Sequence, residues 1–544
     1  MSHPTKTIFI TGGIVSGIGK GITAASLGRL LIDSGYTVMP VKADPYLNQD
    51  AGTMNPFQHG EVFVTDDGTE TDLDLGHYER FLDVNLNRFS NFTSGAVYRS
   101  VMDLEREGSF LGKTIQIIPH VTDEIQQRFR SAEESTRPDF LLCEIGGTVG
   151  DIEALPFIEA VRQYRNDRPG QTLLIHVVKM DYLYPSDESK TKPIQHAVTA
   201  LRSYGIQPDI LVIRCKRALT EEDKAKLSLF TGVRPANIIA AHNAKSLYEI
   251  PSNMAEQGLR EAVFSSFGMQ PADTRPALWT ELYENLAARK KTLKIGLVGK
   301  YVDHDDAYLS VLESIRHAGI YHQVFTEIVP INSEDEDKTA EEVAEMDAII
   351  VPGGFGIRGI EGKIRAIQVV REKNIPFLGI CLGLQTAVIE FSRSHLGLGE
   401  ATSTEFNEQT LEPVIAILPD QLHIKKKGGT MRLGSYPARL IPNSLAEQLY
   451  ALYRPGELED GVIQERHRHR YEVNPHYHER LEKAGMVLSG MSPDGSLVEF
   501  IELPQETHPY FIATQAHPEF RSRPHRPHPL FAGLIAAALE RSPK

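Results

Sequence analysis

The chain is poor in cysteine. Its 544 residues include only three, Cys143, Cys215 and Cys381. An odd and widely spaced set argues against a disulfide framework and indicates a reducing compartment, which we expect to be the cytoplasm. No pair has the Cys-x-x-Cys spacing of structural zinc sites. The sequence nevertheless places Cys381 between two glycines, in PFLGICLGLQ. A cysteine that only packs in the core would not need these neighbours.

Long apolar runs and an excess of positive charge are also missing. No run of about 18 apolar residues occurs, so the sequence predicts no membrane span. The start, MSHPTKTIFITGG, leads into a strand pattern and not into a signal-peptide core. The formal net charge of −15 speaks against broad nucleic-acid binding. Phosphorylated small ligands would therefore need local clusters of Lys, Arg and backbone amides.

Strand and helix patterns alternate through both halves of the chain, and the length of 544 residues predicts more than one domain. This succession predicts an α/β protein with two doubly wound, mostly parallel sheets, each covered by helices on both faces. The pattern breaks at 268–292, which we expect to be a linker with a helix. The predicted domains are therefore 1–267 and 293–544, and the second ends in β structure with a hairpin turn at Pro493–Gly495.

The segment TGGIVSGIGKGIT, Thr11–Thr23, has the order strand, glycine-rich loop, lysine, helix. Such a loop lets backbone amides approach phosphates, and the lysine reaches the outer phosphates. The match to G-x-x-x-x-G-K-[ST] is imperfect. Gly13 to Gly19 spans one residue too many, and Gly21 stands where Ser or Thr usually contacts the metal. We predict a phosphate site; the alternative is a glycine-rich turn with a surface lysine.

The metal ligand missing at Gly21 has to come from elsewhere in the chain. Hard oxygen ligands suit Mg²⁺, and the candidate carboxylates are Asp72, Asp74, Glu144, Asp151 and Glu153. Glu144 lies near the carboxyl end of a buried strand, where α/β sheets place ligands, and Lys42 ends another strand. The alternative for any single acid is that it caps a helix or faces water.

A second candidate anion site lies in SKTKPIQHAVTALRSYG. Pro193 suits the first turn of a helix that Gly205 ends. Lys190 and Lys192 then stand just before the positive end of the helix dipole. The alternative is an ordinary solvated pair of lysines.

Cys381 has the surroundings of a nucleophile. In GICLG, Gly379 and Gly383 permit the sharp strand-to-helix turn that presents a nucleophile in G-x-S-x-G motifs. The segment TQAHPEF supplies His517 as a base and Glu519 to orient it, since alternate residues of a strand share a face. The glycine loop Gly353–Gly356 offers amides for an oxyanion. An isolated buried cysteine is usually core, but the three pieces together predict a Cys-His-Glu site.

A histidine- and arginine-rich segment, QERHRHRYEVNPHYHER, follows later in the second half. Its spacing matches no common metal site. We therefore expect cationic contacts from this segment to a carboxylate or a phosphate.

Nearly the whole chain resembles the CTP synthase family. The resemblance rests on these segments: KADPYLNQDAGTMNPFQHGEVFV, ETDLDLGHYERF, EIGGTVGDIE, KTKPIQH, VPGGFGIRG, GICLGLQ, STEF, GGTMRLG, RHRHRYEVN and HPEF. It implies a synthetase domain related to P-loop NTPases, followed by a class I glutamine amidotransferase domain. In such enzymes ATP phosphorylates the 4-oxygen of UTP, and ammonia released from glutamine displaces the phosphate to give CTP.

The resemblance also implies residue roles. The ATP loop comprises Ser16, Gly17, Ile18, Gly19, Lys20 and Gly21, with Lys42 near the reacting phosphate. Asp74 and Glu144 match the magnesium ligands. The pyrimidine contacts are Asp151, Ile152 and Glu153, and the UTP triphosphate site is Lys190, Lys192, Gln195 and Lys226. In the amidotransferase domain the matches are Cys381, His517 and Glu519 for the triad, Gly354 and Leu382 for the oxyanion amides, and Gln385, Glu405 and Arg470 for ligand binding.

Regulation and assembly are implied in the same way. Arg358 lies in the loop linked to activation by GTP. Product CTP is a feedback inhibitor, the active form is a homotetramer, and many members form filaments. Two alternatives are a P-loop amidotransferase ligase of the cobyrinate or cobyrate type and a non-catalytic filament protein of this fold. The first would not need KTKPIQH, and the second would not need matched groups in two sites.

Overall fold

The computed structural model describes residues 4–13, 15–52, 54–55, 59–270, 278–300, 305–417 and 431–542. They form two compact units. The first comprises Met1–Thr53 and Asp74–Leu278, and the second comprises Met54–Leu73 and Trp279–Lys544. Residues 54–73 thus pack with the second unit, although they precede most of the first in sequence. In the described part of the chain, no helix is both long and apolar enough to cross a membrane.

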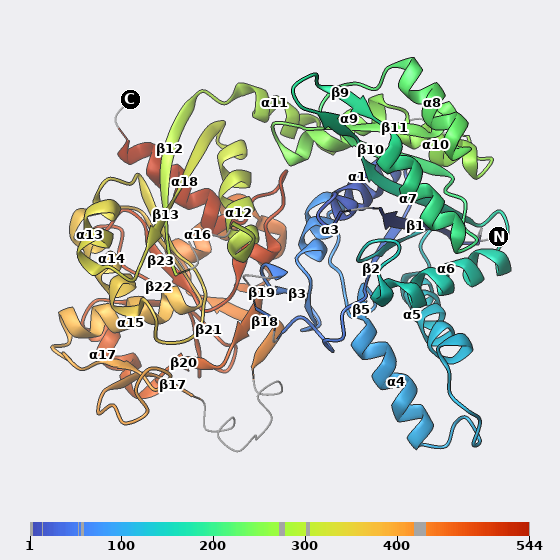
Figure 1. The fold of residues 1–544 in the computed structure, drawn as a ribbon. Coiled ribbons are helices and arrows are strands. Elements are labelled where there is room, and N and C mark those ends of the chain that lie inside the picture. Colours follow the sequence, from blue (N-terminus) through green and yellow to red (C-terminus); the bar gives the residue numbers. More distant parts are fainter. Residues whose placement is uncertain are drawn as a thin grey trace. The chain divides into compact units, whose positions relative to one another are not determined.

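The first unit is built on a parallel sheet of seven strands, in the order β11-β10-β7-β1-β6-β2-β5 (Figure 1). The strands are β1 (Lys6–Gly12), β2 (Val38–Asp44), β5 (Asn91–Thr93), β6 (Phe140–Ile145), β7 (Thr172–Lys179), β10 (Ile210–Cys215) and β11 (Ile238–His242). Their near-continuous apolar runs fit strands that are buried on both faces. The parallel sheet confirms the sequence prediction.

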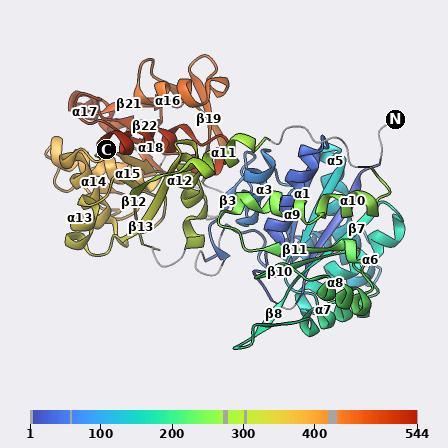
Figure 2. The same ribbon diagram turned by 90° about the horizontal axis from the view of Figure 1, so that it is seen from above.

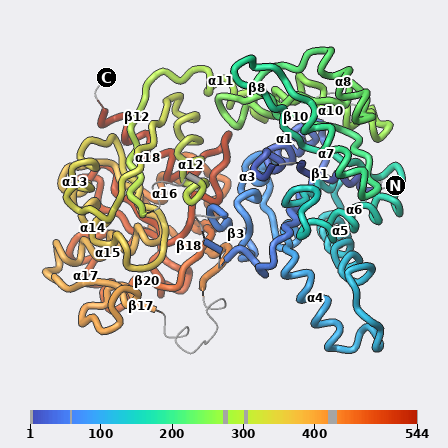
Figure 3. The backbone as a smooth tube through the Cα atoms, in the orientation of Figure 1, coloured from blue at the N-terminus to red at the C-terminus, as the bar shows by residue number. Residues whose placement is uncertain are grey.

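Helices cover this sheet on both faces, and the tube view follows their connections (Figure 3). They are α1 (Lys20–Asp33), α3 (Asp74–Leu82), α4 (Ser94–Arg106), α5 (Thr122–Thr136), α6 (Leu155–Asp167), α7 (Lys192–Ser203), α8 (Glu221–Thr231), α9 (Ile250–Glu256) and α10 (Leu259–Ser266). On one face, Phe9 of β1 packs edge-on against Phe129 of α5 and Tyr164 of α6, with ring centroids 5.4 and 5.6 Å away. Its neighbours Ile8 and Ile10 are also fully buried and point to the opposite face.

A two-stranded hairpin, β8 (Asp181–Leu183) and β9 (Glu188–Lys190), stands between β7 and α7. Figure 2 shows it extending away from the helices of the first unit. Ser189 of β9 bonds Asp223 of α8 at 3.1 Å, so the hairpin is tied to that helix.

The second unit holds a mixed sheet of nine strands, in the order β13-β12-β14-β15-β23-β22-β21-β18-β19. It is parallel from β13 to β23 and antiparallel from β23 to β19. The strands are β12 (Lys291–Gly299), β13 (Val324–Asn332), β14 (Ala348–Val351), β15 (Phe377–Ile380), β18 (Arg432–Leu440), β19 (Val462–His469), β21 (Val487–Met491), β22 (Val498–Glu502) and β23 (Phe511–Thr514). The predicted turn at Pro493–Gly495 lies between β21 and β22, and the sheet turns antiparallel toward its end as predicted.

The helices of the second unit lie on both faces of this sheet, over two buried apolar clusters. They are α11 (Thr280–Ala288), α12 (Leu309–Tyr321), α13 (Glu336–Ala344), α14 (Ile360–Lys373), α15 (Leu382–His395), α16 (Leu445–Tyr453), α17 (His478–Lys483) and α18 (Pro529–Arg541). Within the predicted linker, α11 is the described helix, and residues 271–277 lie outside the described residues.

Two small sheets complete the second unit. One comprises β16 (Thr402–Ser403), β17 (Pro413–Ile417) and β20 (Tyr471–Val473), and the other is the hairpin β3 (Phe63–Val64) and β4 (Glu70–Thr71). Phe63 of the hairpin packs on Phe520, with ring centroids 5.1 Å apart. This contact buries the hairpin against the same unit that contains His517.

Candidate active sites

The loop between β1 and α1 reaches its helix through two glycines with left-handed backbone angles. Gly17 has φ 66°, and Gly19, which caps α1, has φ 94°. Only glycine adopts such angles readily, so the turn itself requires the glycines of the motif. The N-terminus of α1 then offers unbonded amides and a positive dipole end to a phosphate.

Lys20 is the first residue of α1 and is only 8% exposed. Its ammonium donates a hydrogen bond of 2.8 Å to the carbonyl of Gly147, in the loop after β6. Burial lowers the pKa of Lys20, Glu144 raises it, and Lys42 lowers it further. A buried amine therefore stands at the end of the loop, at the position of the lysine in the predicted phosphate loop.

Gly21 makes room for a carboxylate. A Cβ at this position would lie 2.1 Å from Oδ1 of Asp74, the first residue of α3. The Ser or Thr of the common motif would therefore collide with Asp74. The structure thus has a carboxylate in the space where the common motif places a hydroxyl, and this explains why the motif departs from the pattern at Gly21.

Lys42 brings the two predicted metal ligands together. Lys42 and Glu144 are register neighbours on β2 and β6, and the Lys42 ammonium donates to Glu144 Oε1 at 2.8 Å. The same ammonium bonds the Asp74 carboxylate. The hydroxyl of Tyr78 donates to the other oxygen of Glu144. Residues from three elements therefore converge at the carboxyl ends of the strands, where open α/β sheets place their ligands.

The charges in this cluster compensate one another. Burial raises the pKa of Asp74, but Lys42 and His77 outweigh burial, so the net pKa is lowered and Asp74 is ionised. Burial raises the pKa of neighbouring Asp44 to about 6, against the opposing effect of Lys42. The cluster therefore retains an ionised oxygen ligand.

The donor set fits magnesium. Within the described residues, no group of three or more His, Cys, Asp or Glu is arranged to hold a metal ion. Mg²⁺ is usually held by only one or two protein carboxylates and takes its other ligands from water and phosphate oxygens. Asp74, whose carboxylate lies beside Gly21, and Glu144 match that mode. Of the other acids considered, Asp72 belongs to the second unit, and Asp151 and Glu153 are exposed.

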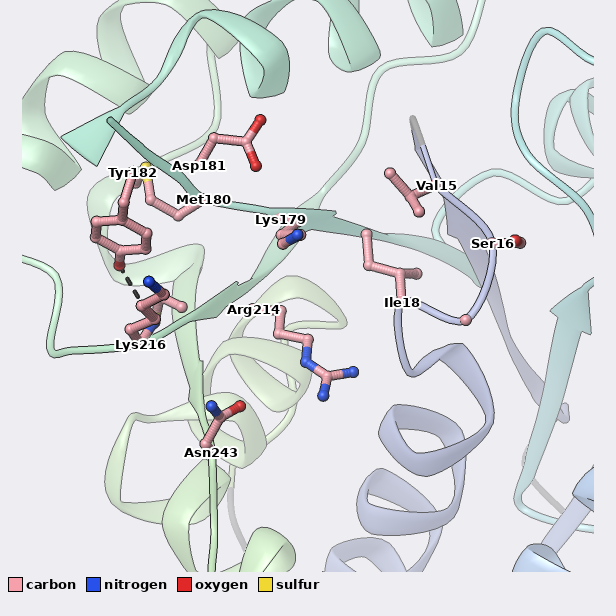
Figure 4. Close-up of a pocket in the computed structure, with 12 residues that line it drawn as sticks. Val15, Ser16, Ile18, Lys179, Met180, Asp181, Tyr182, Arg214, Lys216 and Asn243 are labelled. Atoms are coloured by element: carbon pink, nitrogen blue, oxygen red, sulfur yellow. Dashed lines mark hydrogen bonds between the residues drawn. The ribbon is translucent and has the colours of Figure 1, made fainter. Parts of the chain in front are cut away.

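A pocket of about 440 Å³ opens beside the glycine-rich loop (Figure 4). Its lining residues are Val15, Ser16, Gly17, Ile18, Lys179, Met180, Asp181, Tyr182, Arg214, Cys215, Lys216 and Asn243. Its size is that of a small-molecule site. Ser16, Gly17 and Ile18, predicted as nucleotide contacts, thus line one wall.

Sequence reasoning missed the opposite wall of this pocket. Arg214 belongs to the end of β10, and Nη1 of its guanidinium lies 3.7 Å from the point that a Cβ on Gly19 would occupy. Asn243 directly follows β11. Their places in the sequence could have identified both residues as site candidates, because each lies at the carboxyl end of a buried strand that was predicted or is recognisable.

Three of the predicted triphosphate residues lie around the hairpin and α7. Lys190 ends β9 and bonds Glu188 at 2.6 Å, while Lys192 is exposed at the start of α7. Gln195 lies one turn along α7 and is 9% exposed. The helix ends at Ser203, just before Gly205, as predicted.

Lys226 is exposed on α8 of the same unit. Lys190 and Lys226 both lower the pKa of Glu188, Lys190 more strongly. The two lysines therefore belong to one local group within one chain.

The predicted pyrimidine contacts Asp151, Ile152 and Glu153 lie in the loop that follows β6. All three are exposed, and Ile152 is 81% exposed although it is apolar. In the same loop the amide of Val149 donates to the carbonyl of Gly12 at 2.9 Å. This bond ties the loop to the end of β1 and to the glycine-rich loop.

In the second unit, Cys381 occupies the turn between β15 and α15 with φ 51° and ψ −100°. Such angles strain a residue other than glycine. The flanking glycines permit close packing: a Cβ on Gly379 would lie 2.7 Å from Cβ of Ala513, and one on Gly383 would lie 2.2 Å from the carbonyl oxygen of Val351. The glycines therefore let the helix approach the sheet, and the turn presents the sulfur as a nucleophile elbow does.

The sulfur of Cys381 is nearly enclosed, with the residue 2% exposed. The side-chain amide of Gln515 lies 3.7 Å from Sγ. Gln385, predicted as a ligand contact, donates to the carbonyl of Tyr471 at 3.1 Å and lies 3.4 Å from Oε1 of Gln515. Polar side chains thus position the groups around the sulfur.

His517 and Glu519 are in contact, as the sequence predicts for a histidine base and the carboxylate that orients it. Nδ1 of His517 lies 2.7 Å from Oε1 of Glu519. Burial lowers the pKa of His517, but Glu519 and Cys381 outweigh burial and raise the pKa to about 10. The local structure differs from the expected strand, because β23 ends at Thr514 and a short 3-10 helix begins at Pro518. The carboxylate reaches the imidazole through this turn.

The glycine loop after β14 lies against the triad. A Cβ on Gly353 would lie 2.8 Å from Cε1 of His517 and 3.5 Å from Cβ of Cys381. The amides of Gly354 and of Leu382, the first residue of α15, have no hydrogen-bond acceptor among the described residues. Both amides are therefore available to an oxyanion at the nucleophile.

The predicted glutamine contacts border the same loop. The carboxylate of Glu405 accepts a 2.7 Å hydrogen bond from the amide of Gly356. Burial raises the pKa of Glu405, while the Gly356 amide, Lys300 and Arg470 lower it in part. Glu405 and Arg470 thus place opposite charges beside the loop.

Arg358, predicted to take part in GTP activation, lies just before α14. Its Nε is 3.0 Å from a carboxylate oxygen of Glu334, and its guanidinium donates to the carbonyl of Lys300 at 3.5 Å. These contacts tie the loop to the segments that follow β12 and β13.

The histidine- and arginine-rich segment forms β19 and β20. Arg466 pairs with Asp66 at 2.5 Å, and Arg468 pairs with Glu70 at 2.7 Å. The arginines therefore contact carboxylates, as predicted, and these belong to the hairpin segment 54–73. Backbone carbonyls of the same strand border the triad: that of Arg466 accepts the His517 amide at 2.7 Å, and that of Arg468 lies 4.0 Å from Sγ of Cys381.

Comparison with known proteins assigns both parts of the chain. The family description "CTP synthase N-terminus" matches residues 6–269, and "Glutamine amidotransferase class-I" matches residues 304–537. A CTP synthase of Methanococcus maripaludis is 51% identical over 545 residues, covering 98% of this chain and 100% of that protein. A CTP synthase of Moorella thermoacetica is 53% identical over 541 residues, covering 99% of each.

Among solved structures, the glutaminase domain of Trypanosoma brucei CTPS with bound acivicin matches 46% of this chain and 96% of its own length. Its sequence is 37% identical, and its TM-score is 0.42. The full-length identities of 51% and 53%, together with the two family matches, show that the chain belongs to the CTP synthase family.

Proposed function

We propose that the chain makes CTP by two linked half-reactions, one carried out in each unit. Family membership gives the overall activity, the ATP-dependent amination of UTP with nitrogen from glutamine. One observation carries the division of labour: Lys20, Asp74 and Glu144 gather in the first unit, and the pair His517–Glu519 meets Cys381 in the second. Each unit therefore holds one complete set of reactive groups.

In the first unit, the γ-phosphoryl group of ATP is transferred to the 4-oxygen of UTP. Lys20 acts as a charge clamp, because its buried amine balances the charge of the transferring group. Asp74 and Glu144 would hold Mg²⁺, which would supply charge neutralisation for the phosphates. Lys42, released from these carboxylates, lies near the reacting phosphate.

The nucleotides occupy neighbouring parts of the first unit. The pocket beside the glycine-rich loop suits the nucleoside of ATP, with Arg214 and Asn243 as additional contacts. Lys190, Lys192, Gln195 and Lys226 hold the triphosphate of UTP, and Asp151, Ile152 and Glu153 contact the pyrimidine. CTP shares that triphosphate, which makes it a feedback inhibitor at an overlapping site.

In the second unit, the Cys381 thiolate attacks the side-chain amide carbon of glutamine. The amides of Gly354 and Leu382 hold the oxyanion, and the C–N bond then breaks. His517, which is protonated because Glu519 and Cys381 raise its pKa, gives its proton to the leaving ammonia. Water then hydrolyses the thioester, and glutamate is released.

Ammonia attacks C4 of the phosphorylated UTP and displaces inorganic phosphate, which gives CTP. Regulation and assembly complete the proposal. GTP acts through the loop that contains Arg358, the active form is a homotetramer that can stack into filaments, and the enzyme works in the cytoplasm.

The test is absorbance-monitored conversion of UTP to CTP by the purified full chain. Conversion should require ATP and Mg²⁺ and either glutamine or ammonia, and GTP should increase only the glutamine-dependent rate. A chain that aminates a corrin carboxylate but not UTP would contradict the proposal. So would a folded protein that forms no CTP from either nitrogen source.

A further inference from the structure

A lysine that sequence reasoning did not single out lies behind the oxyanion loop. Lys363 belongs to the first turn of α14 and is 1% exposed. Its Nζ lies 3.9 Å from the point that a Cβ on Gly354 would occupy. The loop therefore lies between two reactive groups: Gly353 faces Cys381 and His517, and Gly354 faces Leu382 and Lys363.

Lys363 is buried without a carboxylate partner. No acidic side chain of the described residues lies within 4.0 Å of its ammonium. The net pKa of Lys363 is lowered to about 7: burial is the largest cause, nearby Lys300 lowers the pKa as well, and Cys381 raises it. Lys300 follows β12, and Cys381 precedes α15; α13 contributes no charged group that acts on Lys363 in the described residues. Of the groups that act on Lys363, Cys381 is the one that can carry negative charge.

An unpaired buried charge is unfavourable unless something compensates it. A cation held in this position becomes more favourable when negative charge forms at Cys381 or at the amides of Gly354 and Leu382. Since the surroundings are largely excluded from water, the attraction is screened less than it would be at the surface. The ammonium lies behind Gly354, so its charge acts on the loop and, across the loop, on the sulfur.

We propose that Lys363 is a positioning residue of the glutaminase site, whose buried cation stabilises the Cys381 thiolate and the oxyanion held by the Gly353–Gly354 loop. The inference rests on the proposed role of Cys381 in glutamine hydrolysis. It predicts that the positive charge of the side chain matters, and not only its aliphatic volume. Lys363→Met keeps most of that volume and removes the charge, whereas Lys363→Arg keeps a charge at all working pH values.

The pH dependence follows from the sign of the charge. Lys363 is positive below its pKa and loses its charge as the pH rises, so its support for the oxyanion is lost on the alkaline side. Lys363→Arg should therefore keep glutamine turnover to higher pH than the wild type. Lys363→Met should lack this support at every pH.

The experiment compares the full-length wild type, Lys363→Met, Lys363→Arg and Lys373→Met. Lys373 is an exposed lysine at the end of the same helix and serves as the matched control. The rate of Cys381 alkylation by iodoacetamide, followed by mass spectrometry of its peptide between pH 5 and 10, reports the thiolate directly. Glutamine-dependent kcat/KM is measured over the same range, and ammonia-dependent CTP formation reports whether the chain is folded.

In Lys363→Met we expect the pH of half-maximal alkylation to rise by about one unit, because a nearby buried opposite charge shifts such an equilibrium by that order. Glutamine-dependent kcat/KM should fall about tenfold, while ammonia-dependent CTP formation stays within about twofold. Lys373→Met should match the wild type, and Lys363→Arg should recover most of the loss.

An unchanged alkylation profile in an ammonia-active Lys363→Met variant would overturn the inference. The inference would also be overturned if Lys363→Met and Lys363→Arg both kept ammonia-dependent activity but lost glutamine-dependent kcat/KM to the same extent. The shape of the side chain, and not its charge, would then matter. If Lys363→Met does not fold, the test is the pH above which Lys363→Arg loses glutamine turnover. If this pH is not higher than in the wild type, the inference is rejected. Retained glutamine turnover in Cys381→Ala would instead reject the proposed function of the site.

Discussion

The two candidate sites of this chain differ in how their charged groups are paired. In the first unit, Lys42 lies between Asp74 and Glu144, so opposite charges already neutralise one another. In the second unit, Cys381 is held at strained backbone angles with His517 beside it, and Lys363 faces it without a carboxylate partner among the described residues. One site is a compensated cluster, whereas the other is a single nucleophile in a positive environment.

The difference fits the ligands that the proposed function gives to each site. A nucleoside triphosphate brings about four negative charges and a metal ion, so the first site needs movable partners that exchange contacts when these arrive. Glutamine carries no net charge, and its reaction creates negative charge on sulfur and oxygen. The second site therefore keeps fixed donors and cations in place before the substrate binds. Substitutions in the two sites should therefore have different effects on glutamine-dependent and ammonia-dependent CTP formation.

The largest separation is expected for Cys381→Ala. Without the thiol no thioester forms, so glutamine-dependent CTP formation should fall by about 10³-fold or more. Ammonia-dependent formation should remain near the wild-type rate, because the first unit keeps all its groups. CTP formation from each nitrogen source is measured by absorbance. Loss of both activities in a folded variant would contradict the division of labour between the units.

Lys20→Ala should affect both nitrogen sources equally. Phosphorylation of UTP precedes attack by ammonia whatever its origin, and loss of the charge clamp should slow this step by about 10²–10³-fold. Lys6→Ala, at the opposite end of β1, is the matched control. Rates of CTP formation with ammonia decide the matter, and a near-normal rate would refute the role of the glycine-rich loop.

Glu519→Gln tests how the charge of the imidazole is maintained. Glu519 and Cys381 together raise the pKa of His517 to about 10 against the effect of burial. Without the carboxylate charge this pKa falls, so the proton that leaves with ammonia is lost at a lower pH. We expect glutamine hydrolysis to drop about 10²-fold and its alkaline limit to move to lower pH. An unshifted limit would speak against this pairing; Glu506→Gln, on the surface, should behave as wild type.

Lys192→Ala should give the smallest effect of the series, confined to nucleotide affinity. Its charge stands at the start of α7, where the helix dipole also favours an anion. We expect the UTP requirement to rise about tenfold and inhibition by CTP to weaken in parallel, with the ATP requirement and basal glutamine hydrolysis unchanged. Steady-state kinetics with each nucleotide varied in turn provides the measurement. Unchanged UTP and CTP affinities would place the triphosphate elsewhere.

The elements that carry chemistry were largely predictable from local sequence. Glycines at 17, 19 and 21 identify the loop after β1, and the order of glycine and cysteine in GICLG identifies the elbow. In both cases short-range backbone requirements restrict the residue type. The parallel sheets follow from apolar runs that alternate with helical patterns, which is also a local signal.

What sequence reasoning missed depends on contacts between distant segments. Arg214 and Asn243 join the nucleotide pocket only because β10 and β11 lie in the same sheet as β1. The sequence around Lys363 is typical of an ordinary helix lysine, and its position behind the glycine loop is evident only from the packing of α14. His517 and Glu519 were placed on a strand, although Pro518 starts a helical turn there. Tertiary packing decides each of these positions, and local pattern does not reveal it.

The segment Met54–Leu73 has a consequence for how such chains can be recombined. It forms the hairpin β3–β4 and pairs Asp66 with Arg466 and Glu70 with Arg468, so the second unit is assembled from two separate lengths of chain. A gene fragment starting at 293 would encode the whole triad but not the hairpin that holds β19. The two units are therefore not exchangeable cassettes joined at a linker. A chimaera that takes its second unit from a relative would also have to take residues 54–73, from within the first half of the gene.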